Sequence, residues 1–210
     1  MPRSPSPETR ALLLDRAGAM LARREPVTLR SLVAGTSVST MAVYTYFDGM
    51  TGLWSALREE GFRRLAERVS GVAPGRDPVR HLAALGVAYV DNAFANPDLY
   101  RVMFDASFDL PDPGAASQTF DHLVAAAQRS IDAGRFSSRS DPADVALRFW
   151  SSGHGVVSLT VTGALTEADL RRHAPAMATA LFIDAGDEPG RARRSVRAAW
   201  AGPQRLRNET

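Results

Sequence analysis

The sequence predicts an all-α protein in two parts, with a small N-terminal domain of three helices and a larger helical domain after a connecting helix. Apolar residues recur at spacings of three and four along most of the chain, which is the period of an α-helix. Clusters of Gly and Pro separate these segments. Only residues 156–161 resemble a strand, and the helical pattern around them places them in a buried helix.

Composition limits the class of protein before any motif is considered. The 210 residues are 45% hydrophobic, enough for one core or for a small domain docked on a larger one. Cysteine is absent, which excludes disulfides and thiolate metal sites. The first ten residues are polar and Pro-rich, unlike a signal peptide, and no apolar run reaches the roughly 18 residues of a membrane span. We therefore expect a cytoplasmic protein without a membrane partner.

Charge is distributed unevenly along the chain. Residues 1–70 carry ten Arg and seven acids, residues 71–186 nine Arg and thirteen acids, and residues 187–210 six Arg and three acids. All 25 basic residues are arginine, which codon usage explains better than arginine chemistry does, so the count alone carries no argument. The basic ends and acidic middle suit an N-terminal module that faces phosphates, joined to one that avoids nucleic acid.

The N-terminal elements follow from apolar spacing and capping residues. Residues 8–24 predict a first helix, which Pro26 ends, and Thr28 is a suitable N-cap for a short second helix. Ser39 can cap a third helix running to about Phe47. Asp48 and Gly49 then form a turn, and Thr51 can cap a fourth helix that extends to Gly71.

Beyond the Gly- and Pro-rich boundary at residues 71–75, helical patterns continue to the last quarter of the chain. We expect helices at 76–95, after Pro97, and at 115–134, 142–162 and 167–185, followed by a basic tail interpreted chiefly as solvated, with phosphate contact or docking through Trp200 as the alternatives. The predicted domains are a flexible arm (1–7), a DNA-binding domain (8–56), a connecting helix and hinge (57–75), a ligand-binding and dimerisation domain (76–186) and the tail (187–210).

The segment from Thr28 to Leu53 has the pattern of a helix-turn-helix. Val38, Val43 and Phe47 form an inward apolar face on the second of the two helices (about 39–47), and small or hydroxyl side chains are left outward. Hydroxyls near helix starts bind phosphate oxygens well. Without Arg, Asn or Gln on this helix, methyl and water-mediated base contacts should dominate. The candidate DNA-binding residues are Thr28, Ser39, Thr40, Met41, Ala42, Tyr44, Thr45 and Tyr46.

These residues resemble the DNA-binding domain of the TetR family of bacterial transcriptional regulators, over about residues 8–56. The resemblance implies an all-α homodimer that binds a palindromic operator on double-stranded DNA and is released by a small ligand in its C-terminal domain. Three positions depart from the family pattern. Ser37 replaces a turn glycine, so that it adopts a left-handed conformation or the turn shifts, Val33 replaces an alanine, and Met50 replaces a frequent lysine.

The second half is similar to a C-terminal domain class of this family with a Trp and His-Gly pattern, carried by residues 149–159 and 96–104. Trp150 and His154 share a helix face, and no acid at matching spacing completes a metal site with His154. Candidate ligand-binding residues, each of which could instead be ordinary core, are Tyr89, Phe94, Met103, Phe104, Phe108, Phe120, Trp150 and His154. Candidate residues of a four-helix dimer interface are Val157, Val161, Met177, Leu181 and Phe182.

The function favoured by the sequence is a ligand-responsive dimeric repressor whose effector is small and apolar. The alternative is a helical scaffold or ligand-binding protein that has lost specific DNA binding, which Ser37 and Met50 would suit. An enzyme is disfavoured because the four histidines stand in no Ser-His or paired-carboxylate arrangement, and no cofactor or metal is expected.

Overall fold

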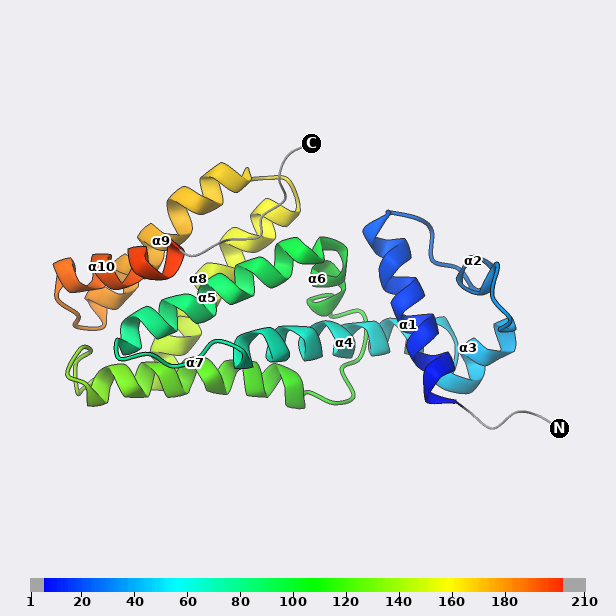
Figure 1. The fold of residues 1–210 in the computed structure, drawn as a ribbon, viewed down its shortest axis with the longest axis horizontal. Helices are drawn as coiled ribbons and strands as arrows, with labels where there is room; N and C mark the ends of the chain where they lie inside the picture. Colours follow the sequence, from blue (N-terminus) through cyan, green and yellow to red (C-terminus); the bar gives the residue numbers. More distant parts are fainter. Residues whose placement is uncertain (1–5, 202–210) are drawn as a thin grey trace. The chain divides into compact units, whose positions relative to one another are not determined.

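A computed structural model of the chain describes residues 6–201, and every regular element in that range is a helix (Figure 1). This confirms the predicted all-α fold. None of these helices is long and apolar enough to cross a membrane. The helices are α1 (Pro7–Ala22), α2 (Leu29–Val33), α3 (Thr40–Phe47), α4 (Met50–Ser70), α5 (Pro78–Ala95), α6 (Pro97–Met103), α7 (Gly114–Asp132), α8 (Pro142–Val161), α9 (Glu167–Asp184) and α10 (Pro189–Trp200).

The helices form two compact units whose boundary differs from the predicted one. The first unit contains the residues up to Arg63 together with Asn96–Ala115, and the second contains Arg64–Ala95 and the residues from Ala116 onward. The division falls inside α4, not at residues 71–75. It also assigns α6 to the first unit, whereas the sequence analysis placed residues 96–104 in the C-terminal domain.

The first unit is built on one apolar cluster shared by α1, α2, α3, α4 and α6. In α1 the buried residues Leu13, Ala17 and Met20 recur at helical spacing, and Pro7 occupies the first turn, where a missing N–H costs nothing. In α6 the side chains of Leu99 and Val102 complete the same cluster. This packing explains why α6 belongs to the first unit although it follows α5 in the chain.

The turn between α2 and α3 is set two residues earlier than the family pattern suggests. Thr28 caps α2 as predicted, because its hydroxyl accepts a hydrogen bond from the Ser31 N–H (3.2 Å). After α2 ends, Gly35 takes the left-handed conformation (φ 71°), which glycine adopts without strain, and Ser37 does not. The turn has therefore shifted, and Ser37 carries no backbone strain.

The junction between α3 and α4 is also left-handed, at Asp48 (φ 57°) and Gly49 (φ 96°), which confirms the predicted turn. The fourth helix starts at Met50, so the proposed cap at Thr51 is wrong by position. Gly52 lies against the end of α3: a Cβ there would be 1.6 Å from the carbonyl oxygen of Phe47. The close approach of α4 to α3 requires a residue without a side chain at position 52.

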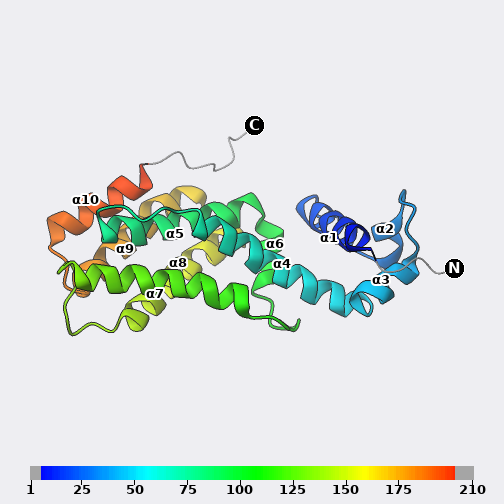
Figure 2. The ribbon, with the colours of Figure 1, turned by 60° about the horizontal axis from the view of Figure 1, so that its bottom comes forward.

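The second unit contains the C-terminal part of α4 together with α5, α7, α8, α9 and α10. Helix α10 packs on α5 and α9 (Figures 1 and 2). The interpretation of this segment as a solvated tail is therefore wrong for residues 189–200, and residues 202–210 of the predicted tail lie outside the described residues. The aromatic rings of Phe136 and Phe149 both pack on Phe182, with centroids 5.6 and 5.3 Å away.

We expect Gly52→Ala to lower the free energy of unfolding by about 1–3 kcal/mol, because the methyl group must push apart two backbone segments. The matched control is Gly18→Ala in α1, where an added Cβ has no atom within 4 Å. That variant should be unchanged or up to about 1 kcal/mol more stable, since alanine is the better helix former. Urea denaturation followed by circular dichroism measures both, and equal midpoints would contradict the contact at Gly52.

Candidate nucleic-acid interface and ligand cavity

Helix α3 buries one face and exposes apolar side chains on the other. Val43 and Phe47 are buried in the core of the first unit, as predicted. On the opposite face Met41 is 65% exposed and Tyr44 50% exposed, with Ser39 and Thr45 also exposed. A short helix that leaves large apolar groups in water offers a surface suited to a partner.

The first turn of α3 leaves the N–H groups of Thr40 and Met41 available, whereas the Ala42 N–H donates to the Ser39 carbonyl (3.0 Å). Ser39 occupies the N-cap position with extended backbone, but its hydroxyl makes no capping hydrogen bond. The early N–H groups of a helix have no intrahelical acceptor, and their positive end of the helix dipole attracts anions. A phosphate oxygen is a suitable acceptor for such groups.

The other predicted DNA-binding residues differ in their burial and in the hydrogen bonds that their hydroxyl groups already make within the protein. The hydroxyl of Thr28 lies 2.9 Å from the Ser31 hydroxyl within the α2 cap, and the Thr45 hydroxyl donates to the Met41 carbonyl (3.0 Å). Tyr46 is half-buried against the core, and its hydroxyl accepts a hydrogen bond from the Ser6 N–H. Thr40 and Ala42 are half-buried. The available contact surface is therefore narrower than the sequence suggests, with Met41 and Tyr44 at its centre.

A small, partly open cavity of about 50 Å³ lies in the second unit. Residues from α4, α5, α7, α8, α9 and α10 form its wall, and none of them is charged. They are Val69, Ala83, Leu85, Gly86, Tyr89, Val90, Thr119, Leu123, Phe149, Trp150, Ser152, Gly153, Ala174, Met177, Ala178, Leu181 and Trp200. Such a wall favours an uncharged, mostly apolar group.

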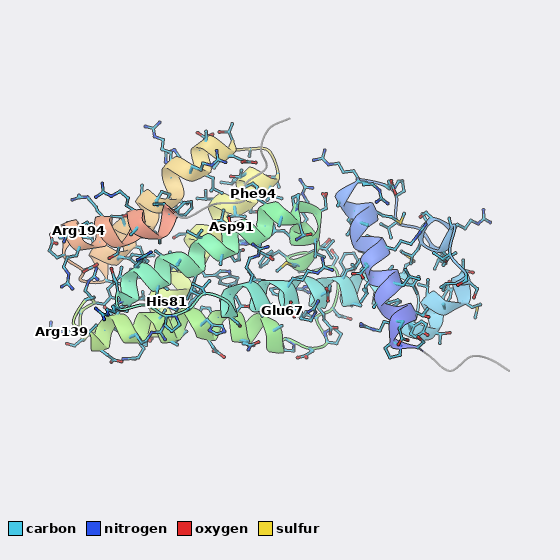
Figure 3. The ribbon with its side chains drawn as sticks, in the orientation of Figure 1. Glu67, His81, Asp91, Phe94, Arg139 and Arg194 are labelled. Atoms are coloured by element: carbon cyan, nitrogen blue, oxygen red, sulfur yellow. The ribbon has the colours of Figure 1, made fainter. Side chains whose placement is uncertain are left out.

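Two of the eight predicted ligand-binding residues, Tyr89 and Trp150, line this cavity. Two more, His154 and Phe120, contact these lining residues. His154 lies next to Tyr89, with its Nδ1 2.9 Å from the Tyr89 hydroxyl oxygen. Phe120 packs edge-on against Trp150, with ring centroids 6.3 Å apart. Phe94, near the end of α5, does not line the cavity (Figure 3).

The remaining three predicted ligand-binding residues belong to the first unit. Met103, Phe104 and Phe108 pack around α4: Met103 lies against Gly61, Phe104 against Phe62 and Phe108 against Trp54. They do not line the cavity of the second unit. The aromatic composition of a helix does not show which core it joins, and this explains the difference.

His154 contacts the cavity wall through the hydroxyl group of Tyr89. Burial lowers the pKa of His154 below its ordinary value, so the imidazole is neutral near pH 7. A neutral imidazole paired with a phenol can donate or accept a proton in a hydrogen bond. Among residues 6–201 no group of three or more His, Cys, Asp or Glu side chains is placed to hold a metal ion.

Sequence reasoning missed Trp200 and Gly153 as cavity residues. Trp200 ends α10, a helix that the many arginines of the segment had concealed. Gly153 has open space where a Cβ would project, so its missing side chain contributes to the cavity. The Gly153-His154-Gly155 motif was the available signal, although it does not show which glycine faces the cavity.

The predicted dimer-interface residues divide by burial. Val157 and Phe182 are fully buried within the single chain and have no surface to offer a partner, and Val161 is also buried. Leu181 lines the cavity, as does Met177, which is nevertheless 40% exposed. Leu159, which belongs to the same apolar run of α8, and Leu147, which was not predicted, are exposed apolar residues on this helix.

The C-terminal half matches a family model described as "Tetracyclin repressor-like, C-terminal domain" over residues 82–181. A protein of unknown function from Rhodococcus sp. RHA1 is 26% identical and aligns over 89% of this chain and 100% of its own, with a TM-score of 0.70. A tetR-family regulatory protein from Rhodococcus RHA1 is 20% identical over 87% of this chain and 100% of its own, with a TM-score of 0.67. RolR in complex with its ligand resorcinol is 18% identical over 90% of this chain and 93% of its own, with a TM-score of 0.63. Comparison with curated protein sequences gives no match.

We expect the low pKa of His154 to make the protein less stable in acid. An unfolded histidine binds a proton near its ordinary value of 6.5, and the folded one binds it less readily, so stability falls as the pH drops below about 6.5. His154→Gln removes this contribution. Urea denaturation at about pH 7.5 and about pH 5 should show a smaller acid-induced loss in the variant, and equal losses would contradict the expectation.

Proposed function

We propose that this chain is a TetR-family transcriptional regulator, a homodimeric repressor that leaves a palindromic operator when a small, mostly apolar effector enters the second unit. The observation that carries the proposal is the exposed face of α3. Met41 and Tyr44 protrude beside an uncapped helix start, while Val43 and Phe47 fix the helix from behind. A helix held in this way fits the major groove of B-DNA.

The mode of reading follows from the side chains available. The exposed residues of α3 include no Arg, Asn or Gln, the residues that form bidentate hydrogen bonds with bases. Backbone N–H groups and the Tyr44 hydroxyl would bind phosphates, and Met41 would contact thymine methyl groups. Discrimination per base pair is then modest, and the operator's symmetry supplies specificity through two half-sites about 34 Å apart.

A dimer is needed to span two half-sites, and the α8–α9 pair is our candidate interface. Leu147, Leu159 and Met177 are large apolar side chains left exposed on these two helices. Pairing two copies through four helices would bury them, as is usual for an isologous interface. This version of the interface uses Met177 and replaces the buried Val157 and Phe182 with neighbours on the surface.

The cavity of the second unit is our candidate effector site. Its uncharged wall and the Tyr89–His154 hydrogen bond suit an apolar molecule that carries a polar group. The resorcinol complex of RolR, a protein of the same fold, supports a small-molecule effector for this chain. Helix α4 begins in one unit and ends in the other, so a shift of its C-terminal part at Val69 would also move the part of the helix that belongs to the first unit.

We expect Tyr44→Ala to weaken binding to DNA from the gene's own upstream region by about tenfold. Tyr44→Phe should fall between wild type and Tyr44→Ala, because it keeps the ring and loses the phosphate donor. Leu12→Ala, which removes an exposed apolar side chain from α1, is the control and should bind as wild type does. Fluorescence anisotropy with a labelled duplex at several salt concentrations measures all four proteins.

The salt series also separates the repressor from a scaffold that has lost DNA binding. For a DNA-binding protein the logarithm of the affinity for DNA falls linearly with the logarithm of the salt concentration. A wild-type protein that does not bind at low salt, or whose weak binding is indifferent to Tyr44→Ala, would instead support the scaffold.

We expect Gly153→Ala to weaken binding of the neutral probe 1-octanol at least about fivefold, because the new methyl group occupies the cavity. Gly155→Ala is the matched control: it lies in the same helix, also has open space for a Cβ, and does not line the cavity. Both alanines favour the helix, so a difference between them reports the cavity. Isothermal titration calorimetry gives the affinities, and equal affinities for the two variants would place the probe elsewhere.

A further inference from the structure

We propose that the effector is an amphipathic anion, with an apolar chain in the cavity and a carboxylate held by Arg193 and Arg197 in the neighbouring groove. This inference rests on the proposed function and names the chemical class of its ligand. The cavity of about 50 Å³ is far smaller than the roughly 300–1,000 Å³ of small-molecule sites. An effector of ordinary size therefore has to continue beyond the present wall.

An open groove of about 730 Å³ lies between α9 and α10. On the α9 side the groove has a wall of mainly small and apolar residues: Pro175, Ala176, Thr179, Ala180 and Ile183. On the α10 side it is lined by Arg193, Val196, Arg197, Trp200 and Ala201. Trp200 is the residue that lines both the groove and the cavity. Rotation of its indole would join the two spaces.

The geometry of α10 places two arginines on the same side of the helix as Trp200, the residue that separates the groove from the cavity. Arg193, Arg197 and Trp200 follow one another at i, i+4 and i+7, so they lie along one face of the helix. Neither guanidinium has an ion-pair or hydrogen-bond partner among residues 6–201. The cavity wall beyond Trp200 carries no charge. A ligand that satisfies both environments has an anionic head and an apolar chain.

The first turn of α10 is held in place by hydrogen bonds, and its last turn carries Trp200, which separates the groove from the cavity. Glu188 accepts hydrogen bonds from the N–H groups of Gly190 and Arg191 (both 2.7 Å), and Arg135 holds Asp187 and Ser195. Trp200 is the last residue of the helix. Movement of the last turn can therefore admit a ligand while the first turn stays in place.

Octanoate and 1-octanol test the head group because they share a chain and differ in charge. Wild type should bind octanoate more tightly than octanol. The double variant Arg193→Gln/Arg197→Gln should lose about tenfold in octanoate affinity and retain its octanol affinity. The control Arg191→Gln/Arg194→Gln removes the same charge from the same helix but from residues that line a different groove, and it should leave both affinities unchanged.

Association kinetics of Trp200→Ala test whether Trp200 separates the groove from the cavity. Stopped-flow measurements should show faster association of both ligands, and an unchanged rate would overturn the entry route through Trp200. Equal binding of octanoate and octanol by wild type and both double variants would overturn the anionic class and leave an apolar effector cavity standing. Binding of neither ligand would overturn both.

The groove could instead be covered by a second copy of the chain. In that case Arg193→Gln/Arg197→Gln would change the molar mass measured by light scattering and leave the preference between octanoate and octanol intact. That result would overturn the ligand assignment. An unchanged mass together with lost octanoate preference supports it.

Discussion

The architecture of the second unit depends on one buried arginine. Arg135 is only 5% exposed and donates hydrogen bonds to Asp187 (2.6 and 2.8 Å), to Asp77 (2.7 Å) and to Ser195 (3.0 Å). These partners come from the segments before α5 and α10 and from α10 itself. The hydrogen bonds to Asp187 raise the pKa of Arg135. Burial disfavours ionisation of Asp77, but its bonds to Ser195 and Arg80 and the charge of Arg135 lower its pKa overall. Removing one partner of such a group typically costs about 3–5 kcal/mol, because the other charge stays buried. The network thus fixes where α10 starts, and helical geometry then brings Trp200 to the cavity.

The first unit holds its exposed helix through backbone contacts. A guanidinium nitrogen of Arg16 in α1 donates to the carbonyl oxygen of Ala34, just after α2, where a helix end leaves acceptors unpaired. At the other end of α3, the left-handed Asp48 and Gly49 redirect the chain and Gly52 allows α4 to approach closely. Both ends of the helix-turn-helix are therefore constrained by contacts that involve the backbone. Side chains on that face can vary with the operator while the orientation of α3 is kept.

Local signals in the sequence were sufficient for most elements but did not identify their tertiary partners. Capping at Thr28, the turn at Asp48 and the apolar spacing of α8 depend on neighbouring residues, and the structure confirms each. The cavity could be anticipated only at Tyr89 and Trp150, because lining a cavity depends on what packs opposite. Met103 and Phe104 are as apolar as any cavity residue, yet α6 packs into the core of the first unit. Helix α10 was hidden because four exposed arginines surround a buried face of only Ala192, Ser195 and Val196.

The role of each arginine depends on the groups around its guanidinium, and the number of arginines in the chain does not reveal it. Arg135 donates four hydrogen bonds to protein acceptors and is structural. Arg16 and Arg58 bind backbone carbonyl groups at helix ends, so their charge supports packing within the first unit. Arg193 and Arg197 differ from all of these because both are exposed and neither guanidinium has an ion-pair or hydrogen-bond partner among the described residues. A guanidinium already satisfied by the protein loses a bond when it turns to an anion, whereas a solvated one exchanges water for a charge-assisted hydrogen bond. Since α3 exposes no arginine, the same chain can place phosphate binding on hydroxyl and backbone donors in one unit and carboxylate binding on arginine in the other.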